Sequence, residues 1–599
     1  MSKYYVGIDL GTTNCAVSYV EKDVKTDKSK ILPLDQVIEF AEVKSFDLLP
    51  SFIFMPDLKE IPDNGFSLPW NSDNTFCVGE FAKKNGSKSP YKVIASAKSW
   101  LCSENIDRLS PVLPWGRNDL VQKISPVTAT EMILTHIKNC WNHLIAKGNS
   151  ELTLDKQNVV ITVPASFDTV ARELTVKAAE KAGINCILLE EPQAAFYSWL
   201  DSMGDKWRKA VNVGDKILVC DIGGGTTDFS LIKVSENGGN LELERVAVGN
   251  HLLLGGDNMD LTLAYSASMK LQKTKKMTLD SYQITGLKYA CQIAKENLLG
   301  NPDPKPEKLT VLGRGSSLIG GAISIELTRD EIIPILIDGF FPKCNLEDKP
   351  LQTVKAGFKT FGLRYENDPA ITKHLAVFLS KYCSDGNLPN TLLFNGGVTK
   401  SEEVRSRITT VLQSWLSQGV KVKILEGNSP DKAVAKGACC YGGVREGKGV
   451  RIKAGSSHSY YLGVEASMPA IPGYKPPVQG VCVLPIGTEE GSSLDINYNG
   501  LGLIVGESTE FKFFSSNGRK SDKPGLIIEN IDSNKDLEEL PPLSALLPAS
   551  EAIPPGSLVP VKLHCEFTET GTLQVWCNSE ADESKWKLDF ELRKEDVSC

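Results

Sequence analysis

The sequence lacks the long apolar runs that a membrane-spanning helix requires. Such a helix needs about 18 or more consecutive apolar residues, and no stretch of the 599 residues approaches that length. The first residues run directly into a strand-like segment, Tyr4 to Asp9, without the apolar region and cleavage site of a secretory signal. The sequence therefore predicts a protein that stays in the cytoplasm and has no membrane partner.

An excess of positive charge is also missing. The chain has 66 Lys and Arg against 74 Asp and Glu, a net charge of −8, and this balance argues against nucleic acid as a partner. The six histidines are far apart and the 15 cysteines contain no Cys-x-x-Cys pair, so a zinc site is not expected. An odd number of scattered cysteines, mostly in apolar runs, favours reduced thiols over disulfides.

The composition, 41% hydrophobic and 23% charged, is that of a globular protein with several structural units. Strand-like runs alternate with helical stretches up to about Gly449, and the clearest predicted helix covers Thr169–Ala182. Beyond that point the pattern is strictly strand-like, as in Val561–Phe567, and predicts an all-β domain. The proline-rich stretch Leu540–Pro555 predicts an irregular loop.

A motif that occurs twice in the sequence indicates a phosphate-binding site. Both copies have an apolar strand, an Asp at its end, a Gly-rich turn with hydroxyls and a second apolar strand; the two turns are Asp9-Leu10-Gly11-Thr12-Thr13-Asn14 and Asp221-Ile222-Gly223-Gly224-Gly225-Thr226-Thr227. Glycine lets backbone N–H groups approach phosphate oxygens, threonine adds donors, and a carboxylate at the strand end suits hydrated Mg²⁺. Two such turns facing each other would hold a polyphosphate. The alternative interpretation of the repeat is a pair of ordinary glycine-containing hairpins without a ligand.

Further motifs follow in a fixed order. They are Val78-Gly79-Glu80-Phe81-Ala82-Lys83, Ala97-Lys98-Ser99-Trp100-Leu101, Val160-Ile161-Thr162-Val163-Pro164, Leu189-Glu190-Glu191-Pro192, Leu254-Gly255-Gly256-Asp257 and Phe394-Asn395-Gly396-Gly397. Together with the two turns, this order resembles the actin-like ATPases and, among them, the 70-kilodalton heat-shock chaperones of the DnaK type. The resemblance covers residues 1 to about 450.

The resemblance implies a site that binds ATP or ADP with Mg²⁺, and K⁺ as a further candidate. It assigns catalysis to Lys83, Glu191, Asp9, Asp221 and Thr226, with Lys83 and Glu191 positioning the attacking water, and assigns Mg²⁺ to Asp9 and Asp221 through water. The implied nucleotide-binding residues are Gly11, Thr12, Thr13, Asn14, Gly223, Gly224, Gly225, Thr227, Gly255, Gly256, Asp257, Gln292, Lys295, Glu296, Leu299, Gly396, Gly397, Val398, Lys400 and Asp431.

Several residues depart from the family pattern. Glu296 stands where the family has an adenine-stacking arginine, and Gln292 and Leu299 replace a glutamate and a serine. Val398 and Lys400 replace a serine and an arginine in the second Gly-Gly wall. A guanidinium plane stacked on a base contributes about 1 kcal/mol or more, so these departures predict weaker or altered base binding. The stretch Ile332–Asn390 looks like an insertion, and the family's leucine-rich linker and helical lid are not recognisable.

The expected fold is an α/β actin-like (duplicated ribonuclease-H-like) ATPase domain of two lobes, followed by an all-β sandwich-like domain. The predicted boundaries are 1–447 for the nucleotide-binding domain, with lobe I at 1–210, lobe II at 211–430 and a closing helix at 430–443; 448–457 for the linker; and 458–599 for a substrate domain without a lid.

The expected function is that of a slowly ATP-hydrolysing DnaK-like chaperone that binds unfolded polypeptide through its β domain. By resemblance, a J-domain co-chaperone and a nucleotide exchange factor are candidate partners. Two alternatives stay open: a nucleotide-gated scaffold with negligible hydrolysis, suggested by the departures at the base site, and a small-molecule kinase of the actin-like superfamily.

Overall fold

The computed structural model of the chain describes residues 2–22, 28–103, 106–115, 122–237, 240–250, 252–301, 303–311, 323–351, 363, 365–383, 386–427, 429–453, 455–456, 458–465, 477–489, 491–498, 500–506, 508–531, 534, 536–546, 554–568, 572–580, 582 and 584–590. The chain divides into two compact units: Met1–Ser166 with Leu174–Ile452, and Phe167–Glu173 with Lys453–Cys599. Each unit has hydrophobic clusters of its own.

One sheet of the larger unit is built around the first strand of the chain. Its strands, in spatial order, are β11 (Cys186–Glu190), β10 (Asn158–Val163), β1 (Tyr4–Leu10), β2 (Asn14–Glu21) and β3 (Lys30–Ile31), with β6 (Leu49–Pro50) also paired to β2. β1 runs antiparallel to β2 and parallel to β10, which is parallel to β11. The hairpin β1–β2 is the first copy of the sequence repeat.

A second sheet of the same unit repeats this arrangement. Its strands, in spatial order, are β18 (Lys423–Ile424), β17 (Thr391–Asn395), β12 (Lys216–Ile222), β13 (Thr227–Asn237), β14 (Asn240–Val248) and β19 (Ile452–Lys453). β12 is antiparallel to β13 and parallel to β17, which is parallel to β18. Asp9 and Asp221 are therefore equivalent residues, each one position before the end of the central strand of its sheet.

Helices separate most of these strands. They are α1 (Glu80–Asn85), α2 (Ala97–Trp100), α3 (Pro126–Trp141), α4 (Thr169–Lys181), α5 (Glu191–Met203), α6 (Trp207–Ala210), α7 (Gly256–Lys275), α8 (Ser281–Gly300), α9 (Arg329–Ile333), α10 (Ile371–Tyr382), α11 (Glu402–Trp415) and α12 (Pro430–Arg445). α3 begins at Pro126 because the Ser125 side chain accepts a hydrogen bond from the Thr128 N–H. The helix predicted at Thr169–Ala182 is confirmed as α4.

Helix α12 is held by two close backbone approaches. A Cβ added at Gly7 of β1 would lie 2.2 Å from the Ala435 carbonyl oxygen, and one at Gly437 of α12 would lie 1.6 Å from that of Ala194 in α5. Because no side chain fits at either position, β1, α12 and α5 pack with their backbones almost in contact. The first turn of α12 is thereby fixed beside the end of β1 that carries Asp9.

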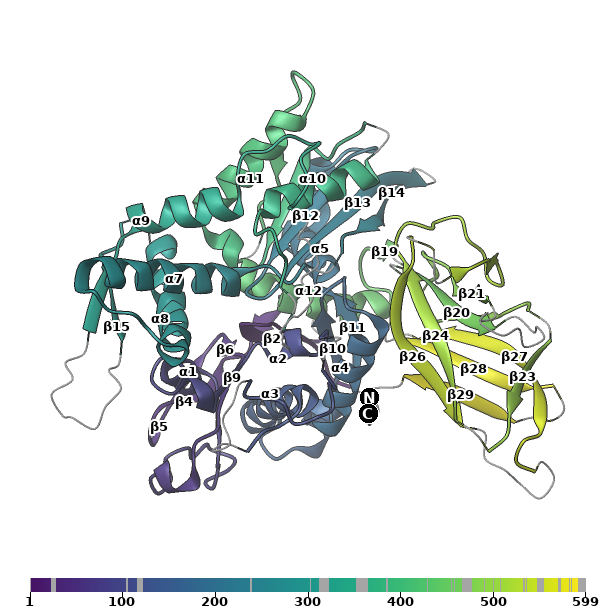
Figure 1. Cartoon of the computed structure of the whole chain (residues 1–599), viewed down its shortest axis with the longest axis horizontal. Coiled ribbons are helices and arrows are strands. Elements are labelled where there is room, and N and C mark those ends of the chain that lie inside the picture. The colour runs from purple at the N-terminus through teal and green to yellow at the C-terminus, as the bar shows by residue number, and fades with distance from the viewer. Residues whose placement is uncertain are drawn as a thin grey trace. The chain divides into compact units, whose positions relative to one another are not determined.

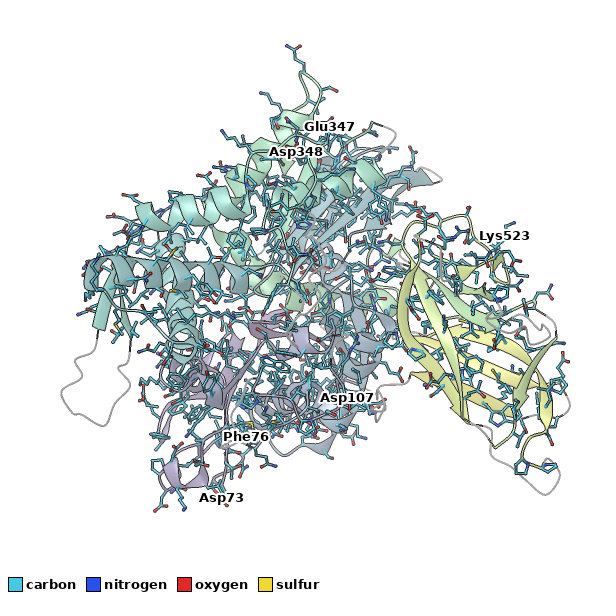
Figure 2. All side chains as sticks on the ribbon, in the orientation of Figure 1. Asp73, Phe76, Asp107, Glu347, Asp348 and Lys523 are labelled. Atoms are coloured by element: carbon cyan, nitrogen blue, oxygen red, sulfur yellow. The ribbon has the colours of Figure 1, made fainter. Side chains whose placement is uncertain are left out.

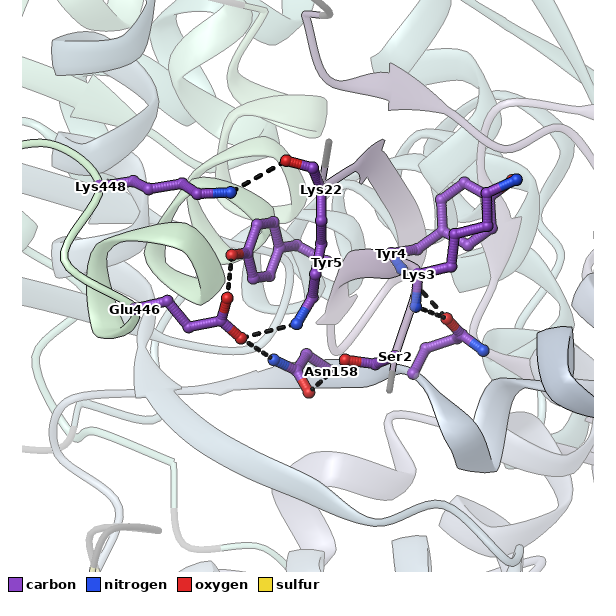
Figure 3. A network of polar contacts seen from close by, with 9 residues as sticks. Ser2, Lys3, Tyr4, Tyr5, Lys22, Asn158, Glu446 and Lys448 are labelled. Carbon is purple, nitrogen blue, oxygen red and sulfur yellow. Dashed lines mark hydrogen bonds and ion pairs between the residues drawn. The ribbon is translucent and has the colours of Figure 1, made fainter. Parts of the chain in front are cut away.

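The C-terminal end of α12 is fastened to the start of β1 by polar contacts (Figure 3). The Glu446 carboxylate accepts hydrogen bonds from the Tyr5 hydroxyl, from Lys22 Nζ at 2.6 Å and from Asn158 Nδ2 at 2.7 Å. The ammonium groups of Lys22 and Lys448 lie 4.6 and 5.1 Å from the centre of the Tyr5 ring. Burial raises the pKa of Glu446, but these donors outweigh it and the pKa is lowered, so the carboxylate stays charged.

Smaller sheets complete the larger unit. They are β4 (Leu34–Glu39) with β5 (Glu42–Phe46); β7 (Phe52–Phe54) with β8 (Cys77–Val78) and β9 (Val93–Ala95); and β15 (Glu307–Val311) with β16 (Ile323–Leu327). The stretch predicted as an insertion, Ile332–Asn390, contributes α10 and the turn Pro334–Asp338. Residues 352–362, 364 and 384–385 of that stretch lie outside the described residues.

The segment that follows α12 is part of the larger unit as far as Ile452. Residues Ile452–Lys453 form β19, which extends the second sheet beside β14. Ile452 is buried, its N–H donates to the Tyr197 hydroxyl at 3.0 Å, and the partly buried Val450 packs against the same apolar cluster. The two large apolar residues of the predicted linker are therefore both packed against this unit.

The smaller unit is β-rich (Figure 1). Its described strands are β20 (Ser459–Glu465), β21 (Val478–Leu484), β22 (Ser492–Asp495), β23 (Leu501–Ile504), β24 (Ser508–Ser516), β25 (Ile527–Ile528), β26 (Glu538–Leu546), β27 (Leu558–Phe567), β28 (Leu573–Ser579) and β29 (Lys585–Phe590). They pair in the order β22-β27-β28-β29-β26-β24-β20-β21-β25, with β23 also on β27. Since Val481 and Leu563, from strands far apart in this order, share one core, the sheet folds over on itself.

The predicted loop at Leu540–Pro555 is wrong over its first part. Residues up to Leu546 belong to β26, and 547–553 lie outside the described residues. The pairing of β26 with β24 shifts register between Phe511 and Phe513, which face Leu543 and Leu540. The two prolines between Leu540 and Leu543 thus lie at a bulge, where a missing N–H costs no ladder hydrogen bond.

Charged side chains such as Asp73, Glu347 and Lys523 are exposed on the surface (Figure 2).

Within the described part of the chain, no helix is both long and apolar enough to cross a membrane. The fourteen described cysteines form no disulfide bonds with one another. The alternation predicted for β27 is confirmed, because Val561, Leu563, Cys565 and Phe567 are all buried.

Candidate functional site

A cavity of about 390 Å³ lies between the two sheets of the larger unit and gathers most of the predicted site residues. Those that line it are Asp9, Gly11, Thr12, Thr13, Asn14, Lys83, Glu191, Asp221, Gly223, Gly224, Thr226, Gly256, Asp257, Gln292, Lys295, Glu296, Leu299, Gly396, Gly397, Val398, Lys400 and Asp431. Residues separated by more than 400 positions in the sequence therefore meet in one cleft.

Three predicted residues, Gly225, Thr227 and Gly255, are not among the lining residues. The Thr227 side chain is fully buried and donates to the Leu254 carbonyl at 2.7 Å. A Cβ at Gly255 would lie 2.7 Å from the Gly223 carbonyl oxygen. Thr227 and Gly255 thus support the second Gly-rich turn from behind.

The two Gly-rich turns lie directly against each other. A Cβ at Gly224 would be 1.6 Å from the Thr13 hydroxyl oxygen, and one at Gly225 would be 2.7 Å from the Thr12 methyl carbon. Among the described residues, the buried Thr13 hydroxyl has no hydrogen-bond partner. A buried hydroxyl without a partner is costly, so this group suits an oxygen-rich ligand that enters between the turns.

Four charged side chains lie at the strand ends next to these turns. Lys98 is buried and is paired with Glu191, whose side chain is 13% exposed. Burial and the Glu191 carboxylate raise the pKa of Asp9 to about 7, and burial with Glu191 also raises that of Asp221. Burial lowers the pKa of Lys98, but Glu191 and Asp9 outweigh it and the pKa is raised, so Lys98 stays protonated. Three carboxyl groups around one ammonium leave a site that attracts a further cation.

Lys83, which the sequence assigns to catalysis, and Lys98 have different surroundings in the cleft. Lys83 Nζ lies 3.0 Å from the carboxylate of Glu296, whose side chain is 44% exposed. Lys98, by contrast, is 5% exposed and faces Glu191 and Asp9. Lys98, which sequence analysis quoted in a motif without a role, is therefore the lysine that pairs with Glu191 in this structure.

Comparison with known proteins fits this geometry. Residues 70–336 match the sequence model of a family described as "Hsp70 protein". The chain is 30% identical over 265 residues to the chaperone protein HscA of Enterobacter sp. (strain 638). The aligned region makes up 43% of this chain and 36% of that protein. It is 29% identical over 342 residues to the HscA homolog of Laribacter hongkongensis, and that aligned region makes up 55% of this chain and 46% of the homolog. The predicted resemblance to the Hsp70 family is confirmed. The matches span less than half the length of these relatives.

The residues of this cleft fit a nucleotide with Mg²⁺. Asp9 and Asp221 offer carboxylate oxygens, and Asn395 Nδ2 donates to Asp221 Oδ2 at 2.8 Å, which orients that carboxylate. Thr162 Oγ1 donates to Asp9 Oδ1 at 3.3 Å. Oxygen donors of this kind are those that Mg²⁺ binds.

Sequence analysis missed some residues of this cleft. Besides Lys98, they include Asn395 and Asp260; Lys295 Nζ lies 2.7 Å from Asp260 Oδ1. Leu336, Ile337 and Phe341, from the stretch predicted as an insertion, also line the cavity. The one available signal was the position of Lys98 between Ala97 and Trp100 in a short apolar motif, because a lysine buried there requires anionic partners.

Binding of Mg²⁺ with a nucleotide is expected to release protons near neutral pH. In the folded protein the pKa of the Asp9 carboxyl is raised to about 7. The protonated carboxyl therefore stabilises the fold at pH values below its pKa in the unfolded chain, and this stabilisation is lost as the pH rises through its pKa in the folded protein. Because a cation binds the deprotonated form, affinity should increase from about pH 6 to about pH 8. Titration calorimetry in buffers of different ionisation enthalpy measures the released protons; an affinity independent of pH would contradict the assignment of Asp9.

Proposed function

We propose that the larger unit binds and slowly hydrolyses a nucleoside triphosphate, and that the chain is a chaperone-type ATPase. The observation that carries this proposal is the meeting of two Gly-Thr turns with Asp9, Asp221, Glu191 and Lys98 in one cleft. Such a cleft holds groups that can orient phosphate and water. The actin-like two-lobed architecture is part of this proposal and is supported by the duplicated sheet.

The proposed roles follow from position and charge. Backbone N–H groups of the two turns and the Thr12, Thr13 and Thr226 hydroxyls hold the phosphate oxygens. Glu191 and Lys98 orient the attacking water, with Lys98 also offsetting negative charge. Mg²⁺, when bound by Asp9 and Asp221 through water, neutralises charge on the β- and γ-phosphates.

The β unit is the proposed polypeptide-binding part. Exposed apolar side chains on it, including Leu558 at 67% and Ile527 at 45%, would suit an extended apolar segment. A J-domain co-chaperone, a nucleotide exchange factor, K⁺ and a cytoplasmic location remain predictions from the resemblance. Coupling between nucleotide state and the β unit also remains a prediction.

The alternative of a scaffold with negligible hydrolysis is favoured by one observation. Glu296 is committed to Lys83 at 3.0 Å and offers no cation to stack on a base, which predicts weak nucleotide binding. The kinase alternative gains no support from a particular observation.

The test is calorimetric titration of the full chain with Mg-ATP, followed by single-turnover hydrolysis on the same sample. Tight binding with slow cleavage is the expected result and would support the ATPase. Binding without cleavage, with Glu191→Gln behaving like the wild type, would support the scaffold. No heat of binding and no protection from thermal unfolding would refute both.

A further inference from the structure

A buried ion pair joins the two large sheets of the larger unit. The Arg245 guanidinium of β14, in the second sheet, is paired with the carboxylate of Glu190, the last residue of β11 in the first sheet. The two side chains are 4% and 8% exposed. Gln193 Nε2 also donates to the Glu190 carboxylate, at 3.2 Å. Because a buried carboxylate that loses its cation is costly, this pair ties one sheet to the other.

Arg245 reaches its partner through an irregularity of the second sheet. The register of β13 and β14 shifts between Leu231 and Ile232, which leaves Val246 of β14 as an extra residue. As a result Arg245 faces the buried Ile232, whereas in a regular ladder it would face the exposed Lys233. Bulges of this kind are common next to active sites, where they redirect a side chain. The bulge thus turns the guanidinium toward the buried face of the sheet.

The carboxylate that Arg245 holds is adjacent in sequence to Glu191. Glu190 ends β11 and is the N-cap of α5, and Glu191 is the first residue of that helix. The Glu191 side chain lines the cleft, and burial together with its charge raises the pKa of both Asp9 and Asp221. A shift of the junction between β11 and α5 would therefore move Glu191 relative to the carboxyl groups at the ends of both central strands.

We infer that Arg245 is a positioning residue for hydrolysis: by holding Glu190, it fixes Glu191 relative to the second Gly-rich turn. The inference rests on the proposed function, in which Glu191 orients the attacking water. Arg245 belongs to the sheet that carries the second turn, because β12 and β13 flank that turn and β13 pairs with β14. It is not among the described residues that line the cavity, so its effect on the reaction passes through Glu190.

The test compares single-turnover hydrolysis of Mg-ATP and the dissociation constant of Mg-ATP for the full chain and its variants. Arg245→Met removes the charge at similar length and should slow hydrolysis by about tenfold or more, because small displacements of catalytic groups have effects of this size. The dissociation constant should change by less than about threefold, since the phosphate-binding turns stay intact. Arg245→Lys keeps a cation without the guanidinium fork and should slow hydrolysis less, by about threefold.

Arg329→Met is the matched control. Arg329 also pairs with a glutamate, Glu403, and neither residue is among the described residues that line the cavity. Both partners of this pair come from the part of the chain between β14 and α12, so the pair does not join the two large sheets. Its loss should change neither the hydrolysis rate nor the dissociation constant.

A double variant separates positioning from stability. Arg245→Met alone leaves the buried Glu190 carboxylate without its cation, so it should lower the melting temperature. Glu190→Gln combined with Arg245→Met replaces both charges by neutral groups of similar size and should recover the melting temperature, yet it should hydrolyse as slowly as Arg245→Met.

A wild-type rate in the double variant, or in Arg245→Lys if both methionine variants unfold, would overturn the inference while leaving the ATPase intact. Absence of hydrolysis by the wild type would instead refute the proposed function, and the inference with it.

Discussion

Replacing Lys98 by alanine is expected to slow single-turnover ATP hydrolysis by about a hundredfold or more, which is the typical effect of losing one preorganised charge beside the reacting group. Lys98 is the buried cation next to Glu191 and Asp9. The fold should survive, because Asp9, whose pKa is already raised to about 7, can take up a proton when the ammonium is removed. Nucleotide should still bind, which calorimetry on the same sample would check.

Lys83→Ala is the matched control, since both lysines line the cleft. Lys83 pairs with the half-exposed Glu296 instead of the buried carboxylates, so its loss should change the hydrolysis rate by less than about threefold, as expected for a residue that makes no contact with the reacting groups. The opposite result, with Lys83→Ala inactive and Lys98→Ala active, would support the assignment made from the sequence.

Gly437→Ala is expected to destabilise the larger unit by about 3 kcal/mol or more, in the range of the severe single substitutions. The added Cβ would lie 1.6 Å from the Ala194 carbonyl oxygen, a backbone atom that cannot move without displacing α5. Because α5 begins with Glu191 and α12 with the turn that carries Asp431, this displacement would also disturb the cleft. Thermal unfolding followed by circular dichroism measures the loss of stability.

Gly443→Ala on the same helix separates packing from helix propensity. A Cβ there would have Tyr5 Cε2 as its nearest neighbour at 3.6 Å, an ordinary contact. Alanine is about 1 kcal/mol more favourable than glycine in a helix, so Gly443→Ala should keep or raise the melting temperature. A similar loss of stability in both variants would show that the approach of α12 to α5 does not determine the stability of this unit.

The sequence predicted the features that depend on local patterns. Asp9 and Asp221 stand out because each follows an apolar strand and precedes a Gly-Thr turn, and the structure has them at equivalent ends of two equivalent strands. Helix α4 and the alternation in β27 were readable for the same reason. These features are encoded by neighbours in the sequence.

Features that depend on distant residues were not readable. Lys83 and Lys98 look alike in sequence, and only the position of Glu191, more than 90 residues later, distinguishes the catalytic candidate. The prolines of β26 argue against a strand until the register shift in β24 is known. The commitment of Glu296 to Lys83 could not be foreseen either, because it joins α1 and α8 across 213 positions.

The short strand β19 has a consequence for the second sheet. β14 would be the outer strand of that sheet if Ile452–Lys453 did not extend it. Outer strands with free backbone groups are sites where another chain can add and start aggregation. By pairing part of β14 with its own backbone, and by anchoring Ile452 to the Tyr197 hydroxyl, the chain leaves less of that edge open to self-association.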